Sequence, residues 1–108
     1  MRACLAFFCL GLASCAAVPR TLSRPPTDAA IVASVRAAFT EAKFPGTPEA
    51  SKLRAAHPVS PGDWLVCLKS STPDQRLRYA LYFNDKFVKS QLAVQIDECD
   101  RETYVPVK

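Results

Sequence analysis

Few residues in this sequence have the type and spacing that catalysis or metal binding requires. The single histidine, His57, stands between an alanine and a proline, and no nucleophile motif such as G-x-S-x-G accompanies it. A calcium site could be suggested by four acids near the C-terminus, Asp97, Glu98, Asp100 and Glu102. Their spacing does not match the D-x-D-x-D-G loop, and no glycine there permits its tight turn. We therefore expect a non-enzyme with no catalytic residue, metal site or cofactor.

The first fourteen residues have the pattern of an export signal. Arg2 is followed by an apolar run over residues 3–10, which is far shorter than the roughly 20 residues that span a bilayer. The next residues, Leu12-Ala13-Ser14-Cys15, resemble the lipobox of bacterial lipoprotein signal peptides, in which a branched aliphatic residue and two small residues precede a cysteine. The resemblance implies cleavage before Cys15 and lipidation of that cysteine.

Lipidation at Cys15 would anchor the protein to a membrane. Each buried CH₂ of an acyl chain such as palmitate contributes about 0.8 kcal/mol, and several chains together anchor stably. In lipoproteins the residue after the cysteine helps to sort between membranes, and Ala16 resembles the pattern of the outer membrane, facing the periplasm. The alternative is an ordinary secretory signal cut after Ala17, which exports the protein without an anchor.

Length and charge bound what remains after processing. Removal of residues 1–14 leaves 94 of the 108 residues, enough for a single small domain. Thirteen basic and ten acidic residues then give a net charge of +3, which is too mild to indicate nucleic-acid binding. Residues 15–26 hold three prolines and few large apolar groups, so we expect a lipidated N-terminus and an extended tether. Residues 27–108 form the expected domain.

Cysteine usage predicts a disulfide. Cys4 and Cys9 leave with the signal and Cys15 is acylated, so Cys67 and Cys99 remain. An even remainder in an oxidising compartment favours one bridge between them, with a pair of buried free thiols as the alternative. Closing a loop of about 33 residues would stabilise the fold by roughly 3 to 4 kcal/mol.

Residues 27–44 predict an amphipathic helix. Apolar side chains recur at helical spacing, a threonine and an aspartate can cap the start, and Pro45-Gly46 ends the run. A second, short helix is predicted over residues 48–56, because the letters TPE at 47–49 have the pattern of a cap, a first-turn proline and a favourable acid.

From residue 63 onward the apolar period changes to two, which predicts three antiparallel strands over 64–68, 77–83 and 87–96. The last two form a hairpin around 84–86. One register gathers the large apolar groups on one side: Phe83 with Val88, Leu81 with Ser90, Tyr79 with Leu92 and Leu77 with Val94. The expected class is α+β, an N-terminal helix packed on a three-stranded antiparallel meander.

The other side of this meander would still carry more apolar surface than a solvated face usually exposes. Its members are Leu65, Cys67, Ala80, Tyr82 and Ala93. We therefore expect residues 97–107 to fold back over it, held by the bridge between Cys67 and Cys99. Tyr104, Val105 and Val107 would pack there or add a short fourth edge strand, which Pro106 would keep short.

Arg76, Arg78 and Lys89 are the candidate partner-contact residues. They lie on polar positions of the predicted strands, where a basic patch could bind lipid phosphates or an acidic partner. Alternating polar positions are also what any half-buried strand presents to water.

About half of the chain resembles a group of small, uncharacterised lipoproteins of alphaproteobacterial type. The resemblance rests on residues 62–68 (GDWLVCL), 78–81 (RYAL) and 93–99 (AVQIDEC), and it implies no activity. Our first hypothesis is a non-catalytic envelope lipoprotein that docks onto another envelope protein or polymer. The alternative is a periplasmic ligand binder or hydrolase inhibitor, which would present a concave apolar pocket or a protruding loop, for example residues 45–62.

Overall fold

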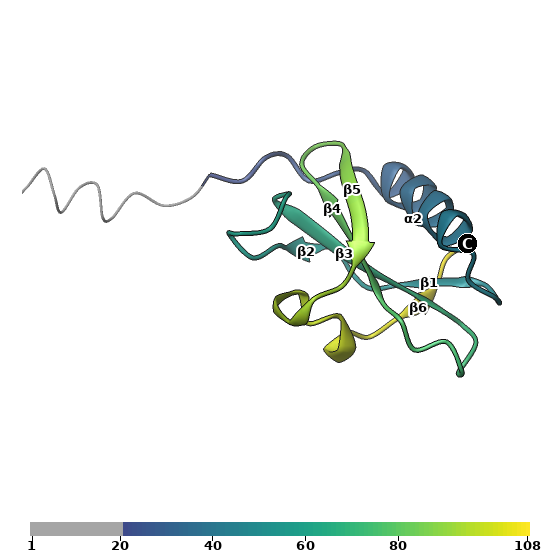
Figure 1. Cartoon of the computed structure of the whole chain (residues 1–108). Helices are drawn as coiled ribbons and strands as arrows, with labels where there is room; N and C mark the ends of the chain where they lie inside the picture. The colour runs from purple at the N-terminus through teal and green to yellow at the C-terminus, as the bar shows by residue number, and fades with distance from the viewer. Residues whose placement is uncertain (1–20) are drawn as a thin grey trace, which may run out of the picture.

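The computed structural model describes residues 21–108, which form one antiparallel sheet with a helix across one face and a C-terminal segment across the other (Figure 1). The helix is α2 (Asp28–Ala42). The strands are β1 (Pro48–Ala50), β2 (Arg54–Ala55), β3 (Trp64–Ser70), β4 (Tyr79–Phe83), β5 (Phe87–Leu92) and β6 (Val105–Pro106). Two short 3-10 helices, η1 (Gln95–Asp97) and η2 (Cys99–Arg101), follow β5.

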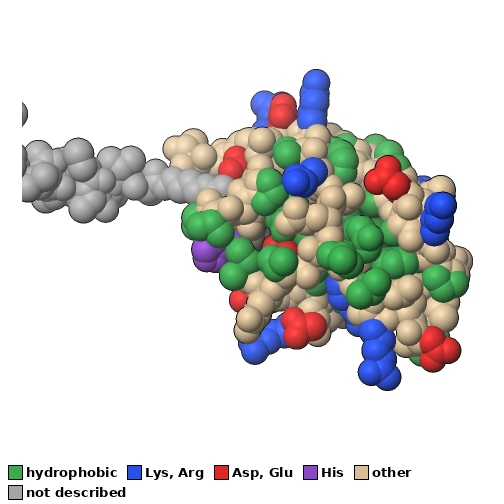
Figure 2. Space-filling model, viewed as in Figure 1, with side chains coloured by type: hydrophobic (Ala, Val, Ile, Leu, Met, Phe, Trp, Pro, Cys, Tyr) green, Lys and Arg blue, Asp and Glu red, His purple; other side chains and the backbone are tan. Residues whose placement is uncertain are grey.

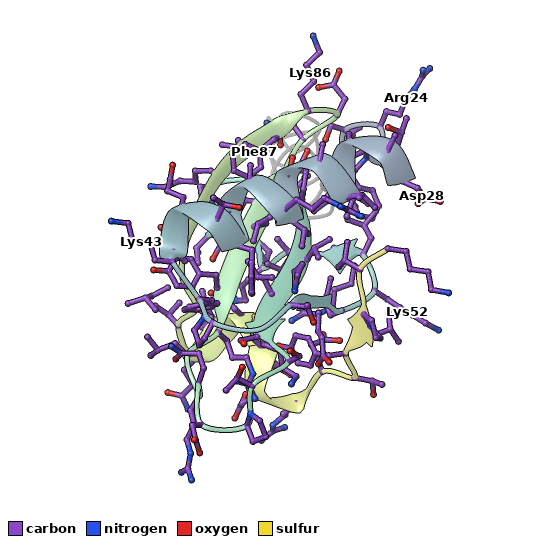
Figure 3. The ribbon with its side chains drawn as sticks, turned by 90° about the vertical axis from the view of Figure 1, so that its right-hand side faces the viewer. Arg24, Asp28, Lys43, Lys52, Lys86 and Phe87 are labelled. Carbon is purple, nitrogen blue, oxygen red and sulfur yellow. A yellow bond between two sulfur atoms is a disulfide. The ribbon has the colours of Figure 1, made fainter. Side chains whose placement is uncertain are left out.

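Helix α2 confirms the prediction for residues 27–44. The Thr27 side chain accepts a hydrogen bond from the Ala30 N–H at 3.1 Å, and the helix ends where Lys43 adopts a left-handed conformation with φ 57°. Its apolar stripe lies on the sheet, with Val35 and Ala38 buried. Figure 3 looks onto α2, with Lys43 at its C-terminal end and Phe87 beside it.

The three predicted strands are present as β3, β4 and β5, and half of the predicted register is confirmed. Leu81 stands opposite Ser90 and Tyr79 opposite Leu92. Phe83 stands opposite Phe87 rather than Val88, because the ladder is irregular between Tyr82 and Phe83. The predicted pair Leu77 and Val94 lies beyond the ends of both strands, since β4 begins at Tyr79 and β5 ends at Leu92.

The predicted fold class, however, is wrong. The sheet has six strands in the order β5-β4-β3-β1-β6, with β2 also paired to β3, so the domain is mostly β with a single helix in the described residues. The predicted helix over 48–56 is replaced by β1 and β2, which pair with opposite ends of β3. β3 is buried on both faces and therefore needs backbone partners along both edges. Those long-range hydrogen bonds outweigh the weak local capping pattern at residues 47–49.

The sheet separates two cores. On the helix side, α2 packs against Val66, Leu68, Leu81 and Phe83. On the opposite side Leu65, Ala80 and Tyr82 surround the disulfide between Cys67 and Cys99, which confirms the predicted bridge. The C-terminal segment folds over this disulfide side as predicted: Tyr104 packs there, and β6 pairs with β1 as a short edge strand. Val107, which was also expected on this side, packs against the core on the helix side instead.

The last residues before α2 are attached to the domain. The Ser23 N–H donates to Asp63 Oδ2 at 2.8 Å, and the indole Nε1 of Trp64 donates to the Ser23 carbonyl at 3.0 Å. Pro26 is buried. The chain therefore enters the domain at the end of β3 that begins with Trp64.

Candidate functional site: the Arg76–Val94 surface

The structure brings only some of the candidate site residues together. Arg76 and Arg78 lie side by side in the segment before β4. Lys89 lies on β5 opposite Tyr82, four residues from the position opposite Arg78, which is roughly 13 Å along the strand. Cys67 and Cys99 form the buried bridge, with 5.6 Å between their Cα atoms. Cys15, the expected lipidation site, lies outside the described residues.

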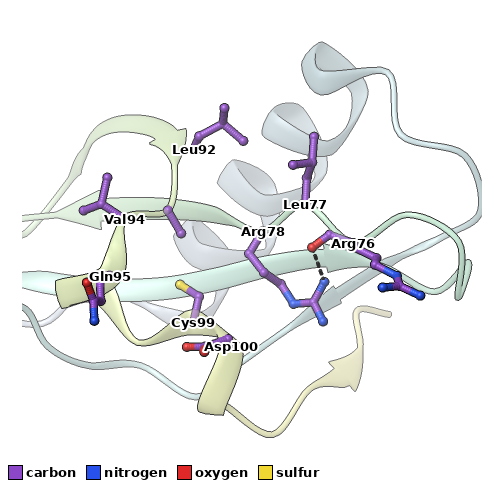
Figure 4. Close-up of a pocket in the computed structure, with 9 residues that line it drawn as sticks. Arg76, Leu77, Arg78, Leu92, Val94, Gln95, Cys99 and Asp100 are labelled. Carbon is purple, nitrogen blue, oxygen red and sulfur yellow. Dashed lines mark hydrogen bonds between the residues drawn. The ribbon is translucent and has the colours of Figure 1, made fainter.

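A depression of about 570 Å³ lies at the open end of the β4–β5 hairpin, opposite its turn and next to the disulfide (Figure 4). Two stretches form most of its wall, Arg76 to Arg78 and Leu92 to Gln95, and η2 closes it with Cys99 and Asp100. Three aliphatic side chains here are about half exposed: Leu77 at 50%, Leu92 at 49% and Val94 at 53%. We call Arg76, Leu77, Arg78, Leu92 and Val94 the Arg76–Val94 surface. Hydrophobic side chains also gather around the end of β5 in Figure 2.

Arg78 is held in place at this surface. Its Nη1 donates to the Arg76 carbonyl at 2.9 Å, and its guanidinium carbon lies 5.5 Å from the centre of the Tyr104 ring. Its Nε is buried and has no hydrogen-bond partner within residues 21–108. A guanidinium beside exposed aliphatic groups is suited to a carboxylate or phosphate acceptor.

Tyr104 links the C-terminal segment to the basic residues. Its ring also lies 5.7 Å from Lys69 Nζ, which contacts Glu49 Oε1 at 2.9 Å. The Tyr104 hydroxyl donates to the Cys99 carbonyl. Burial raises the pKa of Tyr104 to about 12, although the charge of Arg78 opposes the shift. The phenol therefore stays protonated and keeps its hydrogen bond at physiological pH.

Asp97 fixes the other wall of the depression. Its carboxylate is only 1% exposed, and it accepts from the Tyr82 hydroxyl at 2.7 Å and from the Val94 N–H at 2.9 Å. Burial, followed by the hydrogen bond and charge of Asp97, raises the pKa of Tyr82 above its ordinary value. The guanidinium of Arg54 donates to the Asp97 carbonyl and pairs with Glu102. These contacts set the position of Val94.

Sequence reasoning missed Arg54 and the structural role of Asp97. Asp97 was considered only as one of four candidate calcium ligands, and Arg54 was placed in a predicted helix. The two residues are 43 positions apart, and no local pattern connects them. Asp97 directly follows the largely apolar stretch 93–96, but Glu98 stands next to it, so no local pattern distinguished Asp97 as the buried acid.

The described part of the chain holds no cluster of three histidine, cysteine or acidic side chains arranged for a metal ion. His57 is exposed, and its Nδ1 accepts from the Val59 N–H at 3.2 Å. Residues 45–62, which would have formed a protruding loop in an inhibitor, contribute β1 and β2 to the sheet instead. Within residues 21–108 the depression therefore presents two guanidinium groups beside exposed aliphatic side chains.

No helix in the described residues is long and apolar enough to cross a bilayer. Comparison with protein-family models, with curated proteins and with solved structures finds no significant match to this chain.

Proposed function

We propose that this protein is a non-catalytic lipoprotein of the bacterial cell envelope that docks a partner protein through the Arg76–Val94 surface. The proposed localisation rests on Arg2, the apolar run over residues 3–10 and Leu12-Ala13-Ser14-Cys15, with acyl chains on Cys15 as the membrane anchor. Ala16 favours the outer membrane, facing the periplasm. The buried disulfide supports an oxidising compartment.

The docking role is carried by one observation, the exposure of Leu77, Leu92 and Val94 around Arg76 and Arg78. Leaving three aliphatic groups half in water costs free energy, at about 25 cal/mol for each Å² of apolar area that a partner could cover. Arginine is enriched at the energetically important centre of protein interfaces, and the surrounding contacts there exclude water.

The chemistry of the surface defines the partner. Guanidinium groups bind carboxylates in a paired geometry, and aliphatic neighbours exclude water from that contact. The partner is therefore an envelope protein that presents an acidic side chain flanked by aliphatic residues. Asp100, at the rim of the depression, disfavours a partner with acidic residues on that side.

The chain enters the domain away from this surface. Ser23 is attached at the Trp64 end of β3, whereas Arg78 and Leu92 lie at the other end of the strands that pair with it. A five-residue strand spans roughly 17 Å, which is the approximate separation between the attachment of Ser23 and the depression.

The proposed acylation and membrane localisation are tested by intact mass measurement and membrane fractionation of the wild type beside Cys15→Ser. We expect acylated wild type in the membrane fraction and an unacylated, unanchored variant. A mature wild type that is water-soluble, unmodified and begins after Cys15 would refute the lipoprotein assignment.

The docking surface is tested by photo-crosslinking in cells from a reactive residue at position 94, with position 52 as an exposed control outside the surface. We expect one defined partner from position 94 only. Arg76→Glu should abolish the crosslink, and reversing the charge of the partner's contacting acid should restore it. Equal crosslinking from both positions, or no effect of Arg76→Glu, would contradict the proposal.

A further inference from the structure

The two edges of the sheet differ in how well they are protected. At one edge β6 has two residues, of which Pro106 cannot donate a ladder hydrogen bond. At the other edge β5 has six residues and no proline. β5 carries one lysine, Lys89, and an irregular pairing with β4 near the turn, both of which oppose pairing at an edge. A six-residue edge strand without proline still offers a template for another strand. Because the β6 edge is short and contains a proline while the β5 edge is longer and does not, β5 is the edge of the sheet that is suited to pairing with another strand.

The outer side of β5 has backbone groups free to pair. The Ala93 N–H donates to the Arg78 carbonyl, so in the alternating antiparallel pattern Gln91 and Lys89 also direct their backbone groups toward β4. Ser90 and Leu92 then direct theirs outward, where β5 has no strand neighbour among the described residues. Side chains along this edge are apolar at both ends, with Val88 41% exposed and Leu92 49% exposed.

We propose that a second copy of this chain pairs with β5, antiparallel and about a twofold axis at Ser90, so that the two sheets become one. The outward backbone groups require that even-numbered residues face even-numbered residues across the join. With Ser90 opposite the second copy's Ser90, Leu92 lies opposite Val88 and Lys89 lies opposite Gln91. Two aliphatic pairs form, and no charges of like sign oppose each other.

Charge and strand length select this register over its neighbours. A shift of two residues in one direction places Lys89 opposite Lys89, which is repulsive. A shift in the other direction leaves Val88 opposite residue 94, beyond the end of β5. A second copy of β5 supplies the residues that this register requires, an aliphatic residue opposite Val88 and Leu92 and an uncharged residue opposite Lys89.

The pairing is separate from the proposed docking of a partner protein. It uses the edge from Val88 to Leu92, and it leaves Arg76, Leu77 and Arg78, in the segment before β4, outside the join. Leu92 belongs to both surfaces, so the variants that test the pairing avoid it.

The register is tested with single cysteines in the full-length protein, expressed in its own oxidising compartment. Directly paired residues whose backbone groups bond across the join lie about 5.5 Å apart between Cα atoms, within the range of a disulfide. Ser90→Cys should therefore give a band of twice the chain mass on a non-reducing gel. In Gln91→Cys and Lys89→Cys the equivalent positions lie roughly 8 Å apart between Cα atoms, beyond the range of a disulfide, so each alone should stay monomeric. Co-expression of the last two should restore the dimer.

A second measurement does not depend on introduced cysteines. Sedimentation of the purified lipoprotein in detergent should give twice the chain mass for the wild type and the chain mass for Val88→Lys, with unchanged melting of the monomer. Monomeric Ser90→Cys, equal crosslinking of all three cysteine variants, or a crosslink to a protein of different mass would overturn the self-pairing. The docking surface is tested separately by a crosslink from position 94 to a protein whose mass differs from that of this chain.

Discussion

Loss of the Cys67–Cys99 bridge should strongly destabilise this domain. The bridge joins residues 32 positions apart and lies buried between β3 and η2. In the chain-entropy model, closing a loop of this length removes about 12 to 13 cal/mol/K from the unfolded chain, or about 3 to 4 kcal/mol at 25 °C. For a domain of this size that corresponds to a melting temperature lower by roughly 15–30 °C.

The assay is thermal unfolding of the mature protein followed by circular dichroism, in three forms. These are oxidised wild type, wild type with reductant, and Cys67→Ala combined with Cys99→Ala. Reduction keeps both side chains in place, so its effect isolates the crosslink. The double variant adds the packing lost when two buried sulfurs are removed, so it should melt at or below the temperature of the reduced wild type.

The bridge also holds the C-terminal segment over the disulfide side, so we expect its loss to change contacts at the Arg76–Val94 surface as well. Reduction should expose Tyr104 and release the contact between its ring and Arg78. Oxidised wild type that melts together with both reduced wild type and the double variant would refute the assigned role of the bridge.

Three further changes test other parts of the structure. Asp97→Asn should lower the free energy of unfolding by about 1–3 kcal/mol, because the buried hydrogen bond from Tyr82 loses its charged acceptor; unchanged denaturant midpoints would contradict this. Tyr104 has a higher pKa in the folded state than in the unfolded chain, so its protonation contributes to the free energy of folding in full below pH 10, and this contribution is lost between about pH 10 and 12. Tyr104→Phe should therefore remove part of the pH dependence of the free energy of unfolding measured in denaturant titrations. Gly62→Ala should destabilise the protein by about 1–3 kcal/mol, because a Cβ there would lie 2.9 Å from the Phe83 carbonyl oxygen; a melting temperature equal to that of wild type would show that the loop relaxes freely.

Prediction from the sequence worked best where the determining contacts are local. The cap at Thr27 and the helical stripe through Val35 and Ala38 lie within one segment, and both are found in α2. The alternation in β3 and β4 likewise identified these strands and the two sides of the sheet. The export signal and the acylation of Cys15 stay predictions, because they lie outside the described residues.

Prediction failed where a segment takes its structure from a distant partner. Pro48 and Arg54 were placed in a helix by a three-residue pattern, yet their backbones pair with Ser70 and Leu65 of β3. The candidate basic residues were grouped by residue type and by their polar positions along the predicted strands, and the structure joins Arg78 with Arg76 but leaves Lys89 apart.

The amino-acid sequence by itself determined the helix, the strand periods and the pairing of the two remaining cysteines, because spacing and composition specify them within short stretches. Only the tertiary structure decided the number of strands, the burial of Asp97 beneath Arg54, and the meeting of Arg78 with Tyr104. Once β3 is buried on both faces, its backbone groups and the nearby charges need partners. Segments distant in the sequence supply those partners, so no short stretch of the chain specifies these features.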